Sequence, residues 1–434
     1  MENRRQFIAG AGLASLAVTL GAGAAGAASV APLAPGKVDF TALDSPLDGL
    51  YDVDRSIANF DAAYYGAMTR PIHAAYLDRV AFVNRENSLF LRSALKDHPR
   101  DAEIDRSRVA VAGLLGCTPD EIALAGGGTE ALYALIVNYR LLRPGDAVIH
   151  ADVDYDEMQY AMDYLEEMRG AKVVRFALPE PHTEANILAA YEKVLRETPR
   201  AKLLLLTHVS NRNGLIPPVR KIVAMAKARG VDVILDSAQA VGQLPFTVED
   251  TGADFIGFSL HKWLAAPLGT GGIYIRKERL GDIAPFLGNR IYAEDDIRAR
   301  ILSGTVDFAA RLTVRDAVAL HEAIGGEAKF ARLLALRNYW VERVRDVPGL
   351  EILVPEEAGR YGAITAFRLS GMGTDYARYQ RAQALFRDKY ALQVVAKAGL
   401  ASGPGLRVTP ALFNTTAELD RLVTAIRAER AMFA

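Results

Sequence analysis

The chain has 434 residues, with 51 Lys and Arg against 52 Asp and Glu and a formal net charge of −1. This length predicts one large domain and a smaller one, each with its own hydrophobic core. The balanced charge gives no footprint for a nucleic acid. The one cysteine, Cys117, excludes an intrachain disulfide and a multi-cysteine metal site, and no metal site is predicted.

The first 29 residues have the features of an export leader. Arg4, Arg5 and Phe7 resemble the start of a twin-arginine signal, and small residues between positions 22 and 29 suit a cleavage site. The apolar run is too short and too rich in glycine for a membrane anchor. We therefore expect a folded protein that the twin-arginine machinery exports to the periplasm, although a plain basic N-terminus is the alternative.

Residues 30–58 lack a clear period and suggest a linker or an arm. Hydrophobic periodicity then predicts a series of helices and strands. The expected helices are 72–84, 100–115 and 185–197, and the expected strands are 122–125, 147–151, 173–177 and 203–208. Strands that alternate with helices are typical of an α/β fold with a mostly parallel sheet.

A glycine cluster follows the strand at 122–125. Gly127, Gly128 and Thr129 stand where a helix begins that runs to about Arg140. Glycines let the backbone approach an anion closely, and the free N–H groups of a first helical turn bind phosphate. The spacing differs from the dinucleotide pattern G-x-G-x-x-G. A plain turn between strand and helix would look similar.

Two further apolar runs, 231–235 and 254–258, predict buried strands that end in polar residues. These polar residues are Asp236 and Gln239 after the first run, and Ser259, His261 and Lys262 after the second. The ends of neighbouring strands in an open sheet meet at one crevice. A lysine that forms a Schiff base with pyridoxal phosphate (PLP), and a carboxylate that keeps the pyridine nitrogen protonated, are what a PLP enzyme requires. Lys262 and Asp236 fit these roles; an ordinary strand-end Asp and a solvated Lys are the alternative.

Three motifs taken together are more specific to a protein family than Asp236 or Lys262 alone. D-S-A-Q at 236–239, S-L-H-K-W at 259–263 and GTGGIYIRK at 269–277 resemble the cofactor region of the class V aminotransferases, a branch of the fold-type I PLP enzymes. The resemblance implies PLP as the cofactor and a large, mostly parallel, seven-stranded sheet domain sandwiched by helices. It also implies a smaller C-terminal α/β domain.

This resemblance sets the expected domain limits. The large domain spans 59–325 and the small domain 326–434, with a long helix at 308–347 that crosses between them. In the small domain we expect strands at 363–369, 393–396 and 406–408, and helices at 376–389 and 417–431.

The resemblance also implies roles for single residues. Those expected to hold the cofactor phosphate are Gly127, Gly128, Thr129, Ser259 and His261. Those expected near the phenolic oxygen are Asn211 and Gln239, with Asn213 supporting the turn. Tyr155 stands where the family commonly has a stacking histidine, and Arg407 matches the arginine that binds the substrate α-carboxylate. Tyr64, Tyr65 and Arg92, the last in an expected gate loop NSLFLR, are candidates for the substrate wall, although packing or surface roles are common for such residues.

Thr305 resembles the residue that, in homodimers of this family, contacts the phosphate of the cofactor bound to the partner subunit. The alternative is that Thr305 caps the next helix. With Asp307, the GT-x-D form resembles the isopenicillin N epimerase-like group, which implies chemistry at the α-carbon of an amino acid or peptide-like amine. Lys262 would then also be the base that moves the proton.

An aminotransferase or a C–S lyase on the same fold, perhaps tailoring a secreted peptide metabolite, is the alternative. A desulfurase fits poorly, because no cysteine lies in the C-terminal half. A non-catalytic periplasmic binding protein is the alternative of another class.

Overall fold

The computed structural model describes residues 42, 43, 47 and 49–430. The predicted leader and part of the predicted arm lie outside the described residues. The chain divides into Met1–Ala34 and Pro35–Ala434, and all described residues belong to the second unit. Within them, no helix is both long enough and apolar enough to span a membrane.

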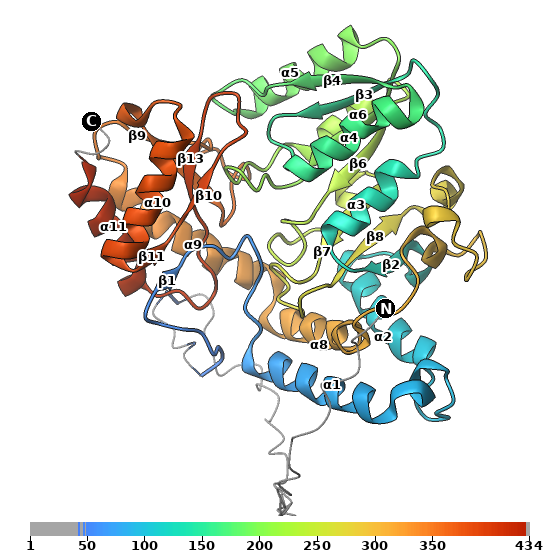
Figure 1. Cartoon of the computed structure of the whole chain (residues 1–434). Helices are drawn as coiled ribbons and strands as arrows, with labels where there is room; N and C mark the ends of the chain where they lie inside the picture. The colour runs from blue at the N-terminus through green and yellow to red at the C-terminus, as the bar shows by residue number, and fades with distance from the viewer. Residues whose placement is uncertain (1–41, 44–46, 48, 431–434) are drawn as a thin grey trace, which may run out of the picture. The chain divides into compact units, whose positions relative to one another are not determined.

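A seven-stranded sheet forms the centre of the fold (Figure 1). Its strands are β2 (Ile122–Ala125), β3 (Ala147–Ala151), β4 (Lys172–Phe176), β5 (Ala201–Thr207), β6 (Asp232–Asp236), β7 (Phe255–Ser259) and β8 (Gly271–Ile275). Their order across the sheet is β2-β8-β7-β6-β5-β3-β4. Neighbours are parallel except at β8, which is antiparallel to both β2 and β7. The predicted mixed, mostly parallel sheet is therefore confirmed.

Helices cover both faces of this sheet. Helices α3 (Gly128–Val137) and α4 (Asp156–Arg169) lie on one face, and α2 (Arg100–Leu115), α5 (Glu184–Glu197), α6 (Val219–Lys227) and α8 (Phe308–Ile324) lie on the other. Successive strand residues point to opposite faces. In β5, Leu203 and Leu205 pack with the first group, whereas Leu204 and Leu206 pack with the second. The continuous apolar run is what a strand buried on both faces requires.

Helix α1 (Arg70–Leu91) is longer than the predicted helix at 72–84. It includes Asn87, which has non-helical backbone angles, so the expected gate loop NSLFLR is instead the irregular end of a helix. The helix extends beyond residue 84 because the buried Phe90 packs against the rings of Phe82 and Phe308. Arg92 is left exposed at the helix end.

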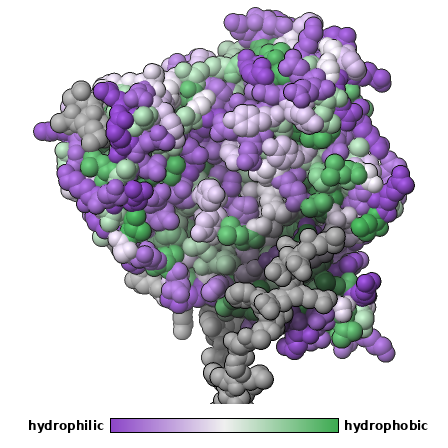
Figure 2. Space-filling view, in the orientation of Figure 1, coloured by the Kyte–Doolittle hydropathy of each residue, from purple (hydrophilic) through white to green (hydrophobic). Residues whose placement is uncertain are grey.

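A second, antiparallel sheet has the order β12-β13-β10-β9. Its strands are β9 (Leu350–Ile352), β10 (Thr365–Leu369), β12 (Val395–Lys397) and β13 (Gly405–Val408), and its helices are α9 (Gly326–Val344), α10 (Tyr376–Tyr390) and α11 (Thr416–Ala428). Trp340, Phe367 and Phe386 are buried in the core that these elements share. Hydrophobic and hydrophilic residues are interspersed on the face seen in Figure 2, as expected when the large apolar clusters lie inside.

Two predicted elements are divided in the structure. The long helix expected at 308–347 is broken into α8 and α9 at Gly325, whose φ of 86° is a left-handed conformation that favours glycine. The strand expected at 393–396 is divided into β11 (Leu392–Gln393) and β12. The division arises because β11 pairs with β1 (Ala58–Asn59), whereas β12 pairs with β13.

The remaining elements are short. They are α7 (Val248–Thr251) and the 3₁₀ helices Pro119–Glu121, Lys277–Asp282, Phe286–Gly288, Ile297–Arg300 and Ser370–Met372. Residues 58–66, named here the bridging segment, include β1 and run from β11 to the loop that follows β7. Its Phe60 N–H donates to the carbonyl of Gln393, and its Gly66 N–H donates to the carbonyl of His261.

Candidate active site

Asp236 and Lys262 lie at the ends of two neighbouring strands. Asp236 is the last residue of β6 and pairs in register with Gly257 of the parallel strand β7. Lys262 lies in the loop that follows β7, whose last residue is Ser259. Asp236 is 5% exposed, and its Oδ1 accepts a hydrogen bond of 2.9 Å from the N–H of Ala238. The structure therefore brings the carboxylate and the amine to one edge of the sheet, as the sequence predicts.

Burial changes the acidity of both groups. It raises the pKa of the Asp236 carboxyl, while the Ala238 N–H and the charge of Lys262 act in the opposite direction. Burial lowers the pKa of the Lys262 amine from 10.5 to about 8; Asp236 opposes this shift and Arg407 adds to it. A lysine with this pKa is more often neutral near neutral pH than an exposed lysine, and only the neutral amine attacks a carbonyl or accepts a proton.

The glycine cluster and the polar residues of β7 form one cradle. The Gly128 N–H donates to Oγ of Ser259 at 3.1 Å, and Nδ1 of His261 donates to the carbonyl of Thr270 at 2.8 Å. A Cβ atom added at Gly128 would lie 2.6 Å from Oγ of Ser259, so only glycine fits. Thr129 follows in the first turn of α3, where helical N–H groups have no helical partner. This is the geometry expected of a phosphate site.

Gln239 holds the Lys262 loop in place. Its Nε2 donates to the carbonyl of Ala63 at 2.9 Å, and its Oε1 accepts a hydrogen bond of 2.9 Å from Nε1 of Trp263. The sequence reasoning missed both of these structural contacts. They leave one amide N–H for the predicted contact with the cofactor, which stays a prediction.

The two asparagines at 211 and 213 differ in their contacts. Oδ1 of Asn211 is buried and has no hydrogen-bond partner among the described residues. The side chain of Asn213 instead bonds to the N–H of Leu215 at 3.1 Å and to the carbonyl of Leu353 at 3.2 Å. Asn213 thus supports the turn as expected, and Asn211 has an amide oxygen that is unused within the protein.

Arg407 is buried on β13, and part of its guanidinium is already engaged. Nη1 donates to the carbonyl of Asn211 at 2.7 Å, and Nη2 donates to the carboxylate of Asp61 at 2.5 Å. Nε is buried and unpaired within the described part of the chain. The role of the Asp61 carboxylate could not be predicted from the sequence, where only the neighbouring tyrosines stood out, because residues 61 and 407 meet only through tertiary folding.

Three tyrosines surround this region. Tyr155 is the N-cap residue of α4, and burial raises its pKa to about 12; the charges of Asp236 and Tyr64 also contribute, which places these groups nearby. Tyr64 and Tyr65 are 72% and 47% exposed, with ring centroids 5.9 Å apart. These placements are compatible with walls of the site, and the roles of all three stay predictions.

Arg92 and Thr305 lie apart from the Lys262 group within this chain. Thr305 is exposed and lines a separate cavity of about 240 Å³ together with Leu91, the neighbour of Arg92. The cap of α8 is Asp307, whose Oδ1 accepts from the N–H of Ala310 at 2.9 Å. The interpretation of Thr305 as a helix cap is therefore wrong, and a contact with a partner subunit stays a prediction.

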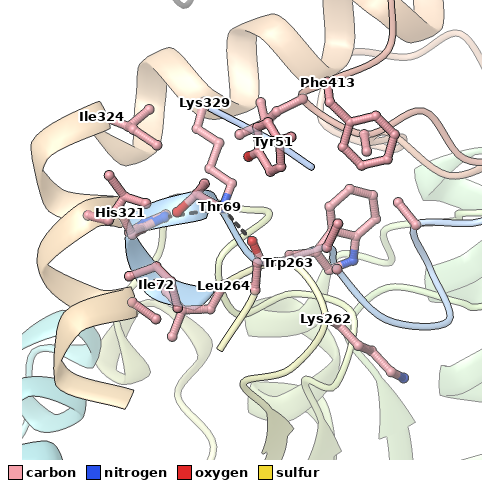
Figure 3. Close-up of a pocket in the computed structure, with 18 of the residues that line it drawn as sticks. Tyr51, Thr69, Ile72, Lys262, Trp263, Leu264, His321, Ile324, Lys329 and Phe413 are labelled. Carbon is pink, nitrogen blue, oxygen red and sulfur yellow. Dashed lines mark hydrogen bonds between the residues drawn. The ribbon is translucent and has the colours of Figure 1, made fainter. Parts of the chain in front are cut away.

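A second buried lysine stands behind the Lys262 loop. Lys329 of α9 donates to the carbonyl of Trp263, and its Nζ lies 3.5 Å from Nδ1 of His321. In Figure 3 the side chain of Lys262 extends away from Lys329. The small cavity between them, about 40 Å³, therefore adjoins the back of the loop. The sequence reasoning missed Lys329, because its position within a long helical pattern gave no separate signal.

These features fit PLP. The cradle at Gly128 accommodates a phosphate, and the unpaired amide oxygen of Asn211 provides a polar contact. The buried carboxylate of Asp236 suits a protonated pyridine nitrogen.

Comparison with known proteins decides the family. A family model described as "Aminotransferase class-V" matches residues 80–422. The chain belongs to the class V aminotransferase family. It is accordingly a PLP-dependent enzyme of the class V fold, and the predicted cofactor is confirmed.

The class V chain is similar to several characterised proteins. It is 28% identical over 393 residues to the isopenicillin N epimerase of Streptomyces clavuligerus, which covers 87% of this chain and 96% of that protein. Among solved structures, the apo cysteine desulfurase of Thermococcus onnurineus NA1 has a TM-score of 0.74 at 19% identity, covering 89% of this chain and 98% of that one. C-DES with glycine covalently linked to its PLP cofactor has a TM-score of 0.73 at 17% identity, covering 88% and 97%. The two structures show a shared fold.

This class V chain has no cysteine placed like a nucleophile. Cys117 lies just before β2, whereas the glycine cradle follows the other end of that strand. Burial raises the pKa of its thiol to about 12, and Glu121 adds to the shift. A thiol with this pKa carries almost no thiolate at neutral pH, and the thiolate is the reactive form.

Proposed function

We propose that the enzyme inverts the configuration at the α-carbon of an amino acid or a peptide-like amine, with Lys262 as the residue that carries PLP. The observation that carries this proposal is the placement of the buried Asp236 and the half-buried Lys262 at adjacent strand ends, beside a glycine cradle. The likeness to an isopenicillin N epimerase over 96% of that protein favours inversion among the reactions of the family.

Bound PLP withdraws electrons from an attached α-carbon and so acidifies its C–H bond. Asp236 would keep the pyridine nitrogen protonated, and the cradle of Gly127, Gly128, Thr129, Ser259 and His261 would hold the phosphate. Asn211 and Gln239 would supply polar contacts to the phenolic oxygen. Tyr155 would provide a wall for the ring, and Arg407 would orient the substrate carboxylate through a charge-assisted contact.

Proton movement falls to Lys262. Its lowered pKa, about 8, keeps a fraction of the amine neutral and able to take a proton from the α-carbon. The bridging segment packs directly on the backbone of the Lys262 loop, since a Cβ at Gly66 would lie 2.1 Å from the carbonyl oxygen of Lys262. This contact fixes the position of the loop that carries the amine.

The test uses the PLP-loaded protein in deuterated water with a panel of single-enantiomer amino acids. We expect α-deuterium and the mirror-image product on chiral chromatography, without a keto product. Accumulation of pyridoxamine phosphate would instead establish an aminotransferase, and release of pyruvate would establish a lyase. Protein that stays colourless after addition of PLP would favour a non-catalytic binding protein.

Borohydride reduction followed by peptide mass spectrometry locates the cofactor. We expect the label on Lys262 and its loss in Lys262→Ala, while the matched variant Lys277→Ala, at an exposed lysine, keeps it. A label on any other lysine would contradict the proposal.

Export and assembly complete the proposed function. Arg4 and Arg5 support transport of the folded protein to the periplasm by the twin-arginine route, and Thr305 supports a homodimer. Replacement of both arginines by lysine should retain the protein in the cytoplasm of a fractionated cell, because the route requires the arginine pair. Unchanged periplasmic recovery would contradict this route.

A further inference from the structure

One face of the small sheet carries a cation that the function proposed above does not use. In the antiparallel pair of β12 and β13, Lys397 lies opposite Gly405 and Val395 lies opposite Arg407. Lys397 and Arg407 therefore point to the same face as diagonal neighbours, with Cβ atoms roughly 7–8 Å apart. Since Ala396 and Leu406 point into the core of the small sheet, this shared face is the opposite one, toward the large sheet.

The neighbouring arginines already have carboxylate partners. Arg407 pairs with Asp61 at 2.5 Å, and Arg212 pairs with Asp156 at 2.6 Å. The side chain of Lys397, by contrast, has no hydrogen bond or ion pair among the described residues, although it is half-buried.

Lys397 is close to these charges. Burial lowers its pKa to about 8; Arg407 and Arg212 add to the shift, while Asp61 and Asp156 oppose it. Arg407 likewise lowers the pKa of Lys262. Because Arg407 acts on both amines, its guanidinium lies near each of them.

We propose that Lys397 binds a second anionic group at the far end of the substrate, so that the enzyme prefers an amino acid or peptide-like amine with a distal carboxylate. The inference rests on the proposed function, which places the reacting amine at Lys262 and the α-carboxylate at Arg407. A half-buried ammonium keeps only part of its hydration, so an incoming carboxylate meets a small desolvation cost there and supplies a hydrogen bond and the opposite charge.

The first test compares L-glutamate with L-glutamine, which match in size and differ by one negative charge. Binding to the PLP-loaded protein is followed by the change in the visible spectrum of the cofactor. We expect glutamate to bind about tenfold more tightly or better, which corresponds to about 1.4 kcal/mol. Lys397→Met should abolish this preference without weakening glutamine binding, and Lys397→Arg should retain it.

The matched control is Lys389→Met, at an exposed lysine of α10 whose Nζ is 2.7 Å from Glu429. It should keep the preference. Equal binding of the two amino acids by the unmodified protein would overturn the proposal. The proposal would also be overturned if Lys397→Met lowered the affinity for glutamate and for glutamine by the same factor, since a structural defect has that effect.

A second test separates this inference from the proposed chemistry. Glutarate has two carboxylates and no amine, whereas pentanoate has one carboxylate. We expect glutarate to raise the Tm of the protein more than pentanoate does, and Lys397→Met to remove the difference, because a ligand of the native state stabilises it by mass action. Selective stabilisation by glutarate with no spectral response to any amino acid would support the anion site and refute the proposed chemistry. A spectral response without the glutarate difference would refute the anion site alone.

Discussion

The carboxylate of Asp61 and the guanidinium of Arg407 are 2.5 Å apart, so an internal carboxylate already occupies part of the group assigned to the substrate. Asp61 is held there by the backbone, since the N–H of Thr409 donates to Phe60 at 2.8 Å and the N–H of Ala62 donates to Thr409 at 3.3 Å. On the proposed function, a substrate carboxylate would share Arg407 with Asp61, and the buried Nε is the guanidinium nitrogen that has no partner among the described residues.

Asp61→Asn should leave a buried guanidinium without its countercharge. We expect the free energy of unfolding to fall by about 2–3 kcal/mol, as for the loss of a hydrogen bond to a charged group. Added acetate should restore part of this loss by supplying a carboxylate. Urea denaturation with and without acetate measures both effects.

Asp52→Asn is the control, because Asp52 pairs with Arg70 at the surface, at 3.2 Å. Asp52→Asn should lower the free energy of unfolding by less than about 1 kcal/mol. Equal losses in the two variants, or no response of Asp61→Asn to acetate, would contradict the special position of Asp61.

Gly128→Ala should weaken PLP binding. The added Cβ would lie 2.6 Å from Oγ of Ser259 and 3.0 Å from Cβ of Ala238, and such overpacking costs about 1–3 kcal/mol. Equilibrium dialysis should show a Kd for PLP raised by about tenfold or more. Gly113→Ala, where a Cβ meets no atom within 4 Å, should bind PLP normally. An unaltered Kd in Gly128→Ala would place the phosphate elsewhere.

Lys329→Met should change how stability depends on pH. Burial lowers the pKa of Lys329 from 10.5 to about 7, so the unfolded chain binds more protons between pH 7 and 10.5, and native stability rises with pH in that window. Lys329 adds up to about 1.4 kcal/mol per pH unit to the slope of the free energy of unfolding, and this slope disappears in the variant. Below pH 7, Lys329 is protonated in both states, so it lowers the free energy of unfolding by a constant amount.

The neighbouring His321 contributes no slope in this window, because burial, with a contribution from Lys329, lowers its pKa to about 3. Lys262 titrates near pH 8 in both proteins and cancels in the difference. Urea midpoints measured at several values from pH 7 to 10 give the comparison. Parallel curves for the two proteins would show that Lys329 keeps an ordinary pKa.

Thr305 should act across the subunit interface of a homodimer. Lys262→Ala and Thr305→Glu should each be inactive alone, the second because its carboxylate repels the cofactor phosphate. A refolded 1:1 mixture should recover about a quarter of the activity, since half of the dimers are mixed and each has one intact site. A mixture as inactive as its components would place Thr305 outside the partner's site.

The sequence predicted the elements that a short range of residues determines. Strands β2 and β3 and helix α2 have the predicted limits, because their apolar patterns and turn residues are local. The junction at Gly325 was missed, since the apolar pattern continues across it and only the left-handed backbone separates α8 from α9. The short strand β9 was missed because three residues carry too little pattern.

The candidate site shows the same division. Asp236 ends a strand, and Lys262 and Gly128 lie within a few residues of a strand end, so their placement could be predicted from local sequence. The pairing of Asp61 with Arg407 and the contact between Gln239 and Ala63 join residues far apart in sequence. Such contacts depend on how the small sheet and the bridging segment pack, which no local pattern encodes.

The bridging segment has a practical consequence for protein engineering. A truncation that begins after Gly66 would retain every strand of the seven-stranded and the four-stranded sheet and would remove β1, the partner of β11. It would nevertheless remove the countercharge of Arg407, the carbonyl that holds Gln239 and the backbone that covers Lys262. Shortened versions of the enzyme should therefore begin upstream of residue 58.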